Sequence, residues 1–169
     1  MKDFMQDRIF LFNSKNIKIK NINSIYLIDN KQSIIDLNNL INYQSSEFNM
    51  WQNFSKVSSS AVIVFTKTSI SNTGKVLVAI VFEKGDFLSI VSEGKAIYNN
   101  MVTVFDMFFG RLGIVFEKDL IDENLLYLFD ALNVDYLLIY LTGSSGFTLQ
   151  LRKTSAIKIL INNNNVLFT

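Results

Sequence analysis

The residue types that carry most acid–base and thiol chemistry are missing from this sequence. It contains no His, no Cys and no Pro among its 169 residues. Without His, the usual general base near neutral pH is absent, and so are the serine and cysteine triads that depend on it. A zinc site would have to use carboxylates alone, which is rare. Any enzymatic chemistry must therefore come from carboxylates, Lys, Tyr, Ser or Arg.

An acidic group lies just after an apolar run in the second half of the chain. Its members are Glu117, Asp119, Asp122 and Glu123. We expect Asp119 to cap a helix, with Asp122 and Glu123 in its first turn, because the helix dipole favours negative charge there. A metal site would need further oxygen ligands from elsewhere, and the sequence points to none. We interpret the group as helix capping.

Two further patterns have a simple structural interpretation. Asp106 lies in an aromatic stretch near Arg111, and a buried carboxylate must be paired, so we favour an ion pair or a solvent-facing Asp over a catalytic acid. The loop over residues 142–146 offers backbone N–H groups to an anion, but it lies between two predicted strands and lacks a helix dipole. The sequence thus predicts no catalytic residue, no metal ligand and no cofactor.

Two apolar segments are candidates for an interface. They are the helical set Phe48, Trp51 and Phe54, and the C-terminal run Val166, Leu167 and Phe168. Core packing is the default interpretation of the helical set, but aromatic residues are also enriched as interface anchors. The C-terminal run follows a stretch of Asn and could pair with a neighbouring sheet by strand addition.

Apolar periodicity predicts the elements of the first half of the chain. Residues 9–28 favour one or two strands. Ser33 and Asp36 resemble a capping box, and the apolar spacing after them predicts a helix that continues, or restarts near Ser46. Residues 61–92 then contain three short strands with Gly-containing turns between them, which predicts an antiparallel meander.

The second half of the chain shows a similar alternation. A helical stripe is expected between Gly94 and Gly110, followed by a strand over 111–116 and the helix that begins near Asp119. A second antiparallel meander is expected over 136–161. The pentapeptide Ile-Val-Phe-Glu-Lys occurs at 80–84 and again at 114–118, and we interpret this as coincidence, because the two copies fall in different predicted elements.

These elements predict a single α+β domain over residues 1–169. The fold class is antiparallel sheet, built of short meander strands, with about three to four helices packed on it. No Pro-rich or Gly/Ser-rich linker indicates an internal boundary.

The composition limits the kinds of partner that we expect this protein to bind. The net charge is +1, which gives no strong attraction to nucleic acid. The longest apolar stretches are far shorter than the roughly 20 residues of a spanning helix, and the start of the chain lacks the apolar core of a signal peptide. We expect a cytoplasmic protein without a membrane span.

Three classes of function remain. The leading prediction is a non-enzymatic subunit or adaptor that works by binding a protein partner or its own copies, because catalytic residue types are missing and 49% of residues are hydrophobic. The first alternative is an enzyme that uses carboxylate, Lys or Tyr chemistry on a small molecule. The second alternative is a single-stranded nucleic-acid-binding module.

Overall fold

The chain forms two compact units, Met1–Ser92 (unit 1) and Glu93–Thr169 (unit 2). The structure is a computed structural model. It describes residues 6–13, 16–36, 38, 42, 45–70, 74–94, 101–122, 124–143, 154–162 and 165–169. The single domain over residues 1–169 stays a prediction.

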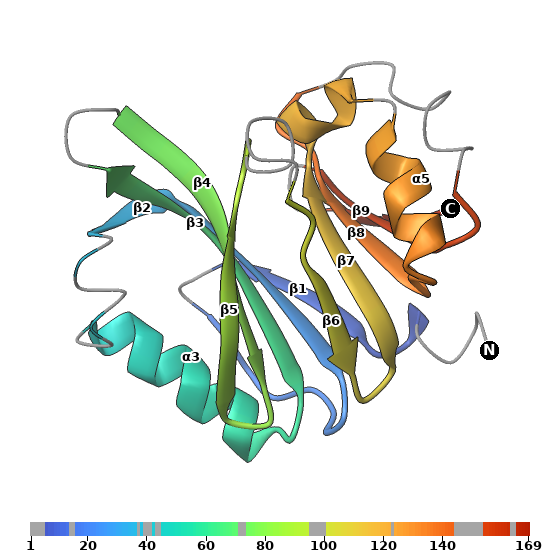
Figure 1. Cartoon of the computed structure of the whole chain (residues 1–169). Helices are drawn as coiled ribbons and strands as arrows, with labels where there is room; N and C mark the ends of the chain where they lie inside the picture. Colours follow the sequence, from blue (N-terminus) through green and yellow to red (C-terminus); the bar gives the residue numbers. More distant parts are fainter. Residues whose placement is uncertain are drawn as a thin grey trace. The chain divides into compact units, whose positions relative to one another are not determined.

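Unit 1 is built on a five-stranded mixed sheet with the order β1-β2-β3-β4-β5 (Figure 1). Its strands are β1 (Ile9–Asn13), β2 (Ile25–Asp36), β3 (Ala61–Ile70), β4 (Gly74–Glu83) and β5 (Asp86–Ser92). The first three strands are parallel, and β4 is antiparallel to both of its neighbours. The central strands are buried on both faces and are almost continuously apolar, as parallel strands covered on both sides usually are.

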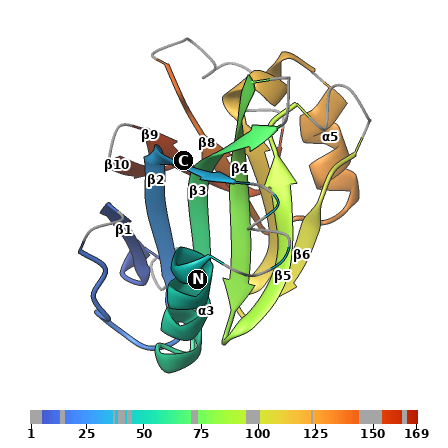
Figure 2. The same cartoon turned by 90° about the vertical axis from the view of Figure 1, so that its left-hand side faces the viewer.

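The helix α3 (Ser46–Val57) links β2 to β3 and covers one face of this sheet (Figure 2). Its first turn is capped by Ser45, whose side chain accepts a hydrogen bond from the Phe48 N–H. Phe48 and Trp51 are each only 1% exposed and lie in a core cluster with Tyr26 and Phe82. This apolar face, with the cap, explains why the segment is helical.

Unit 2 is built on a second five-stranded mixed sheet, with the order β10-β9-β8-β7-β6. Its strands are β6 (Val104–Met107), β7 (Gly110–Phe116), β8 (Tyr136–Tyr140), β9 (Ile157–Asn162) and β10 (Asn165–Phe168). The strands β7, β8 and β9 are parallel, while β6 and β10 pair antiparallel at the two edges.

A 3₁₀ helix, η1 (Glu117–Ile121), and the helix α5 (Asn124–Ala131) connect β7 to β8. Leu125, Leu126 and Phe129 of α5 pack into a core cluster with Val115 and Leu137 of the sheet. Phe129 lies so close to Gly113 that a Cβ on that glycine would come within 2.7 Å of the ring. Gly113 therefore allows the helix to approach the sheet closely.

The predicted fold class is wrong. Both sheets are mixed, and each contains three parallel strands, whereas we expected antiparallel sheets of short meander strands. The described elements include two α-helices, α3 and α5, besides the short 3₁₀ helix η1, rather than the predicted three to four packed helices. The physical reason is that α3 and α5 act as crossovers, and a crossover lets consecutive strands run parallel.

Some of the individual predicted helices and strands agree with the structure, and others do not. The meander over 61–92, the helix beginning at Ser46 and the strand over 111–116 are confirmed. The helix expected after Ser33 does not begin there, because β2 continues to Asp36 around a bulge that follows Asn30. Asn38 is helical, and the other residues of the predicted segment 37–41 lie outside the described residues.

Three predictions for the second half need correction. Where a helical stripe was expected, residues 104–107 form β6, which suits the β-branched residues Val102 to Val104. Residues 147–152 of the expected second meander lie outside the described residues. The strands on either side of them, β8 and β9, pair directly with each other and in parallel, whereas a meander would separate them by its middle strand. The helix expected to begin near Asp119 begins at Asn124, whose N–H donates to the Asp122 side chain.

Among the described residues, no helix is both long and apolar enough to cross a membrane.

Candidate functional site

Glu117 is the polar side chain of unit 2 whose position best suits a functional site. It follows Phe116, the last residue of the buried strand β7, and begins η1. Its Oε2 accepts hydrogen bonds from the Thr142 hydroxyl and the Gly143 N–H, each at 2.7 Å, and also from the Thr142 N–H. Three donors on one carboxylate oxygen fix the side chain in place.

The topology of the sheet explains why Glu117 contacts Thr142 and Gly143. Because β7 and β8 are parallel, their carboxyl ends lie at the same edge, and the residues that follow each strand are neighbours. Phe116 and Tyr140 are register partners at these ends, so Glu117 and the segment 141–143 come directly after a matched pair. The carboxyl ends of parallel strands are the usual place for ligands in sheets of this kind.

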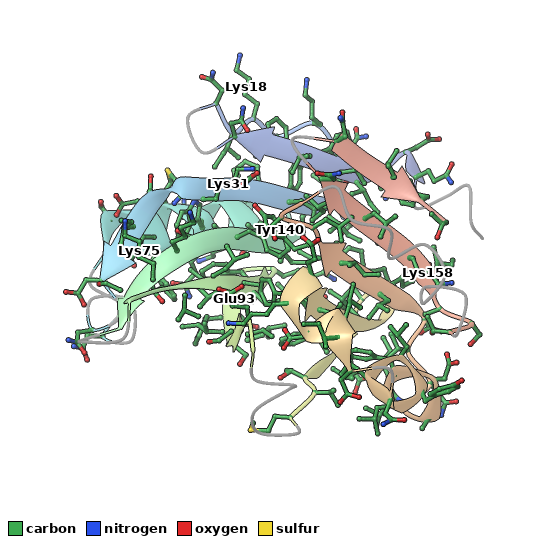
Figure 3. The ribbon with its side chains drawn as sticks, turned by 90° about the horizontal axis from the view of Figure 1, so that it is seen from above. Lys18, Lys31, Lys75, Glu93, Tyr140 and Lys158 are labelled. Carbon is green, nitrogen blue, oxygen red and sulfur yellow. The ribbon has the colours of Figure 1, made fainter. Side chains whose placement is uncertain are left out.

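Two more polar side chains lie near this edge. Tyr140 is the last residue of β8 and is buried, with its ring centroid 6.4 Å from that of Phe116; Figure 3 labels it. Asp119 of η1 is also buried, and its Oδ2 accepts a hydrogen bond of 3.2 Å from the Gly94 N–H. Asp119 is thus a buried hydrogen-bond acceptor for a backbone N–H group. Its predicted role as the N-cap of a helix is wrong.

Unit 1 has its own buried polar pair in the middle of two parallel strands. Asn30 of β2 and Thr66 of β3 are register partners, and the Asn30 Nδ2 lies 3.3 Å from the Thr66 Oγ1. Both residues are at most 3% exposed. The pair sits next to the bulge in β2, and bulges are frequent beside functional sites.

A third polar group fastens α5 to the start of β9. The Asp130 Oδ1 accepts hydrogen bonds from the hydroxyl groups of Thr154 and Ser155 and from the Ser155 N–H, at 2.7–3.1 Å. Burial acts to raise the pKa of Asp130, but these hydrogen bonds and the charge of Lys158 outweigh it, so the pKa lies below its ordinary value. We interpret this group as structural.

Asp106 and Arg111 form an ion pair in the structure, which is one of the two roles that we favoured for Asp106. The Arg111 Nε lies 2.8 Å from the Asp106 Oδ1, and the Asp106 side chain is 82% exposed, so the pair lies at the surface. In the 142–146 segment, which we interpreted as a plain loop, Ser144 to Gly146 lie outside the described residues. Among the residues that the structure describes, no group of three or more acidic side chains is placed to hold a metal ion.

The two interface candidates have different surroundings. Phe48 and Trp51 lie in the core of unit 1, and Phe54 is partly buried against Tyr26, so this set forms no exposed patch. Val166 and Phe168 are half-buried in the edge strand β10 and Leu167 is 55% exposed. An interface role for this last segment stays a prediction.

Solved structures resemble the chain in fold. Nit3 of Saccharomyces cerevisiae, a member of branch 10 of the nitrilase superfamily, matches with a TM-score of 0.57 and 10% identity over 80% of this chain. An amidase mutant from Nesterenkonia sp. AN1, with an acetamide moiety added covalently at its active-site cysteine, matches with a TM-score of 0.53 and 10% identity over 85% of this chain. The glutamine-dependent NAD+ synthetase of Acinetobacter baumannii matches with a TM-score of 0.50 and 15% identity over 84% of this chain.

The fold is nitrilase-like. The chain spans 60% of the length of Nit3, 66% of the amidase and 33% of the synthetase. No protein-family model and no curated protein matches the sequence.

These findings correct the leading functional prediction. A non-enzymatic assembly subunit is wrong, because the solved structures of this fold include amidases and because the expected aromatic patch is part of a core. The sequence also departs from the amidase in one decisive respect. The amidase carries an active-site cysteine, whereas this chain has no Cys at all.

Proposed function

We propose that the chain is an enzyme that hydrolyses a small amide by carboxylate chemistry, with Glu117 as general base. The observation that carries the proposal is the position of Glu117. Its carboxylate is held by the segment 142–143 at the carboxyl ends of two parallel strands, in a fold that amidases also use. This is the first alternative from the sequence, made specific to one residue and one bond.

The missing thiol decides the type of mechanism. Without Cys the chain cannot form a thioester, and in the proposed mechanism water attacks the amide carbonyl directly. Glu117 takes a proton from the attacking water while the C–O bond forms, and then passes that proton to the nitrogen as the C–N bond breaks. The products are a carboxylic acid and an amine or ammonia, and Glu117 returns to its charged form.

Thr142 and Gly143 would act as positioning residues. Their hydrogen bonds orient the carboxylate of Glu117 before any substrate arrives, which lowers the cost of orienting it during the reaction.

The test is the release of ammonia from primary amides, with acetamide and glutamine as probes. We expect slow release by the wild-type chain and a loss of about 100- to 10,000-fold in the Glu117→Gln variant, because an amide can accept hydrogen bonds but cannot take the proton. Glu47→Gln, at an exposed position in the first turn of α3, is the matched control and should keep full activity.

Alkylation with iodoacetamide should leave the activity unchanged, since there is no thiol to react. Absence of ammonia release from the pure wild-type chain would overturn the enzymatic proposal. Equal rates for wild type and Glu117→Gln would show that another group is the base.

The proposal also includes a cellular location and a partner for the protein. We place the enzyme in the cytoplasm and propose that copies of it self-associate. Exposed apolar residues on η1 and α5, namely Ile121, Tyr127 and Leu128, support self-association, since the burial of such side chains stabilises contacts between copies. Sedimentation of the purified chain would test it, and a monomer at all concentrations would reject it.

A further inference from the structure

The loop between β1 and β2 is fixed at its base by the hydroxyl group of Tyr26. This oxygen accepts hydrogen bonds from the N–H groups of Lys20 and Asn21, at 2.9 and 3.0 Å, and donates one of 2.6 Å to the Asn21 carbonyl. The Tyr26 ring is fully buried and stacks on Phe10, with 5.4 Å between the ring centroids. Residues 16–24 therefore have a defined shape, although they lie outside any helix or strand.

The side chains that this loop presents are aliphatic and cationic. Ile19 and Ile22 are 45% and 62% exposed, and the lysines at 18 and 20 are exposed as well. Figure 3 shows Lys18 pointing outward from the ribbon. Within the described part of the chain, neither Lys18 nor Lys20 forms an ion pair with a carboxylate. Two large aliphatic side chains are thus held in water beside two cations.

The charge of this segment differs from that of the whole chain. No Asp or Glu occurs from Arg8 to Ile28, whereas Arg8, Lys15, Lys18 and Lys20 fall within it. The chain as a whole carries a net charge of only +1. Unit 1 therefore has a local excess of positive charge at the loop.

We infer that the loop over residues 16–23, called here the Tyr26 loop, docks on an anionic lipid surface. Exposed aliphatic side chains gain by entering the boundary between headgroups and acyl chains, and lysines beside them are attracted to lipid phosphates and carboxylates. A single-stranded nucleic acid would instead require aromatic rings for base stacking. The exposed apolar side chains of the loop are isoleucines, which favours the lipid.

The attraction is moderate, so the binding should be reversible. Each lysine near an anionic surface contributes about a fivefold gain in affinity at moderate salt. Removal of both lysine charges should therefore weaken binding by about 25-fold. At about 1 M salt the Debye length falls to about 3 Å, and the attraction should largely disappear.

The experiment measures flotation of the full chain with vesicles of phosphatidylcholine, with and without phosphatidylserine. We expect the wild type to float with the phosphatidylserine vesicles at low salt and to remain behind with pure phosphatidylcholine. The variant Lys18→Gln/Lys20→Gln should lose about 25-fold in affinity. The variant Ile19→Ser/Ile22→Ser should also bind less, while its remaining binding stays sensitive to salt.

The matched control is Lys67→Gln/Lys75→Gln, which removes the same charge from exposed positions on β3 and β4. Figure 3 shows Lys75 away from Lys18. This control should float like the wild type, and near-ultraviolet dichroism should confirm that all variants fold. Failure of the wild type to float, or equal losses in the control and the loop variants, would overturn the inference. So would tight binding of a single-stranded RNA homopolymer that depends on Lys18 and Lys20 without any binding to vesicles.

Discussion

Arg111 and Asp106 form an ion pair between neighbouring strands, with 2.8 Å between Nε and Oδ1, and the same guanidinium reaches the end of a helix. Its Nη1 donates a hydrogen bond of 2.7 Å to the carbonyl of Leu132, just after α5. Asp106→Ala should cost at most about 1 kcal/mol, because exposed pairs contribute little. Arg111→Ala should cost more, about 1–3 kcal/mol, since it also removes the donor at the helix end. Urea unfolding of both variants measures the difference, and equal costs would contradict it.

Trp51 is expected to behave as a core residue. It is 1% exposed in the core of unit 1, and its indole Nε1 has no hydrogen-bond partner among the described residues. Trp51→Ala should lower the free energy of unfolding by about 3–5 kcal/mol. Because Trp51 is the only Trp, unfolding must be followed by circular dichroism. Met50→Ala, at a position that is 46% exposed, is the control and should change stability by less than about 0.5 kcal/mol.

Ser45 should contribute to stability as the N-cap of α3. Its side chain accepts the Phe48 N–H at 3.0 Å. Ser45→Ala should therefore cost about 0.5–2 kcal/mol in thermal or urea unfolding. Ser46→Ala changes the next residue, whose hydroxyl donates a hydrogen bond to the exposed Glu47 side chain, and should be nearly neutral. The same loss in both variants would mean that the cap is not the cause.

Asp130 makes stability depend on pH in the acidic range. Although burial acts to raise its pKa, hydrogen bonds from Thr154 and Ser155 lower the pKa below the ordinary value of 3.8. A lowered pKa in the folded state gives stability that is present above the unfolded-state pKa and is lost as the pH falls through the folded-state pKa. Asp130→Asn should thus be less stable than wild type at about pH 7. The difference in stability between the two should disappear as the pH falls below the ordinary pKa of Asp.

Melting curves across this range measure the effect. Asp86→Asn removes an exposed carboxyl in unit 1 and serves as the control. A gap between Asp130→Asn and wild type that stays constant with pH would show that the charge of Asp130 does not stabilise the fold.

Local patterns predicted several elements correctly, and the pairing direction was the main error. The Gly-containing turns at 74 and 85 identify the hairpins of unit 1, because both glycines have positive φ. No such local rule describes β8 and β9, whose pairing depends on a connection that lies outside the described residues. One signal was present but not used. All five residues of β8 are buried and apolar or aromatic, which is typical of a parallel strand covered on both faces.

The candidate site was only half visible in the sequence. Glu117 belonged to the acidic group that the sequence singled out, but capping was a sufficient explanation for its neighbours. The partners that make Glu117 distinctive, Thr142 and Gly143, lie 25 and 26 positions away. Sequence spacing alone cannot predict such a contact, because it follows from the parallel register of β7 and β8. An acidic residue directly after a buried apolar run is the signal that would have pointed to this edge.

The register of β2 with β3 has a consequence for the order of events during folding. Asn30 and Thr66 are partners although they are 36 positions apart, whereas β3 and β4 meet across a short turn. Hairpins close within microseconds, while distant pairings must first overcome the entropy of a longer loop. On the ribosome, β1 and β2 emerge before the other three strands of their sheet, of which β3 pairs with β2. Their apolar faces and open edges are then exposed, so a nascent chain of this design should depend on chaperones until β3 has left the exit tunnel.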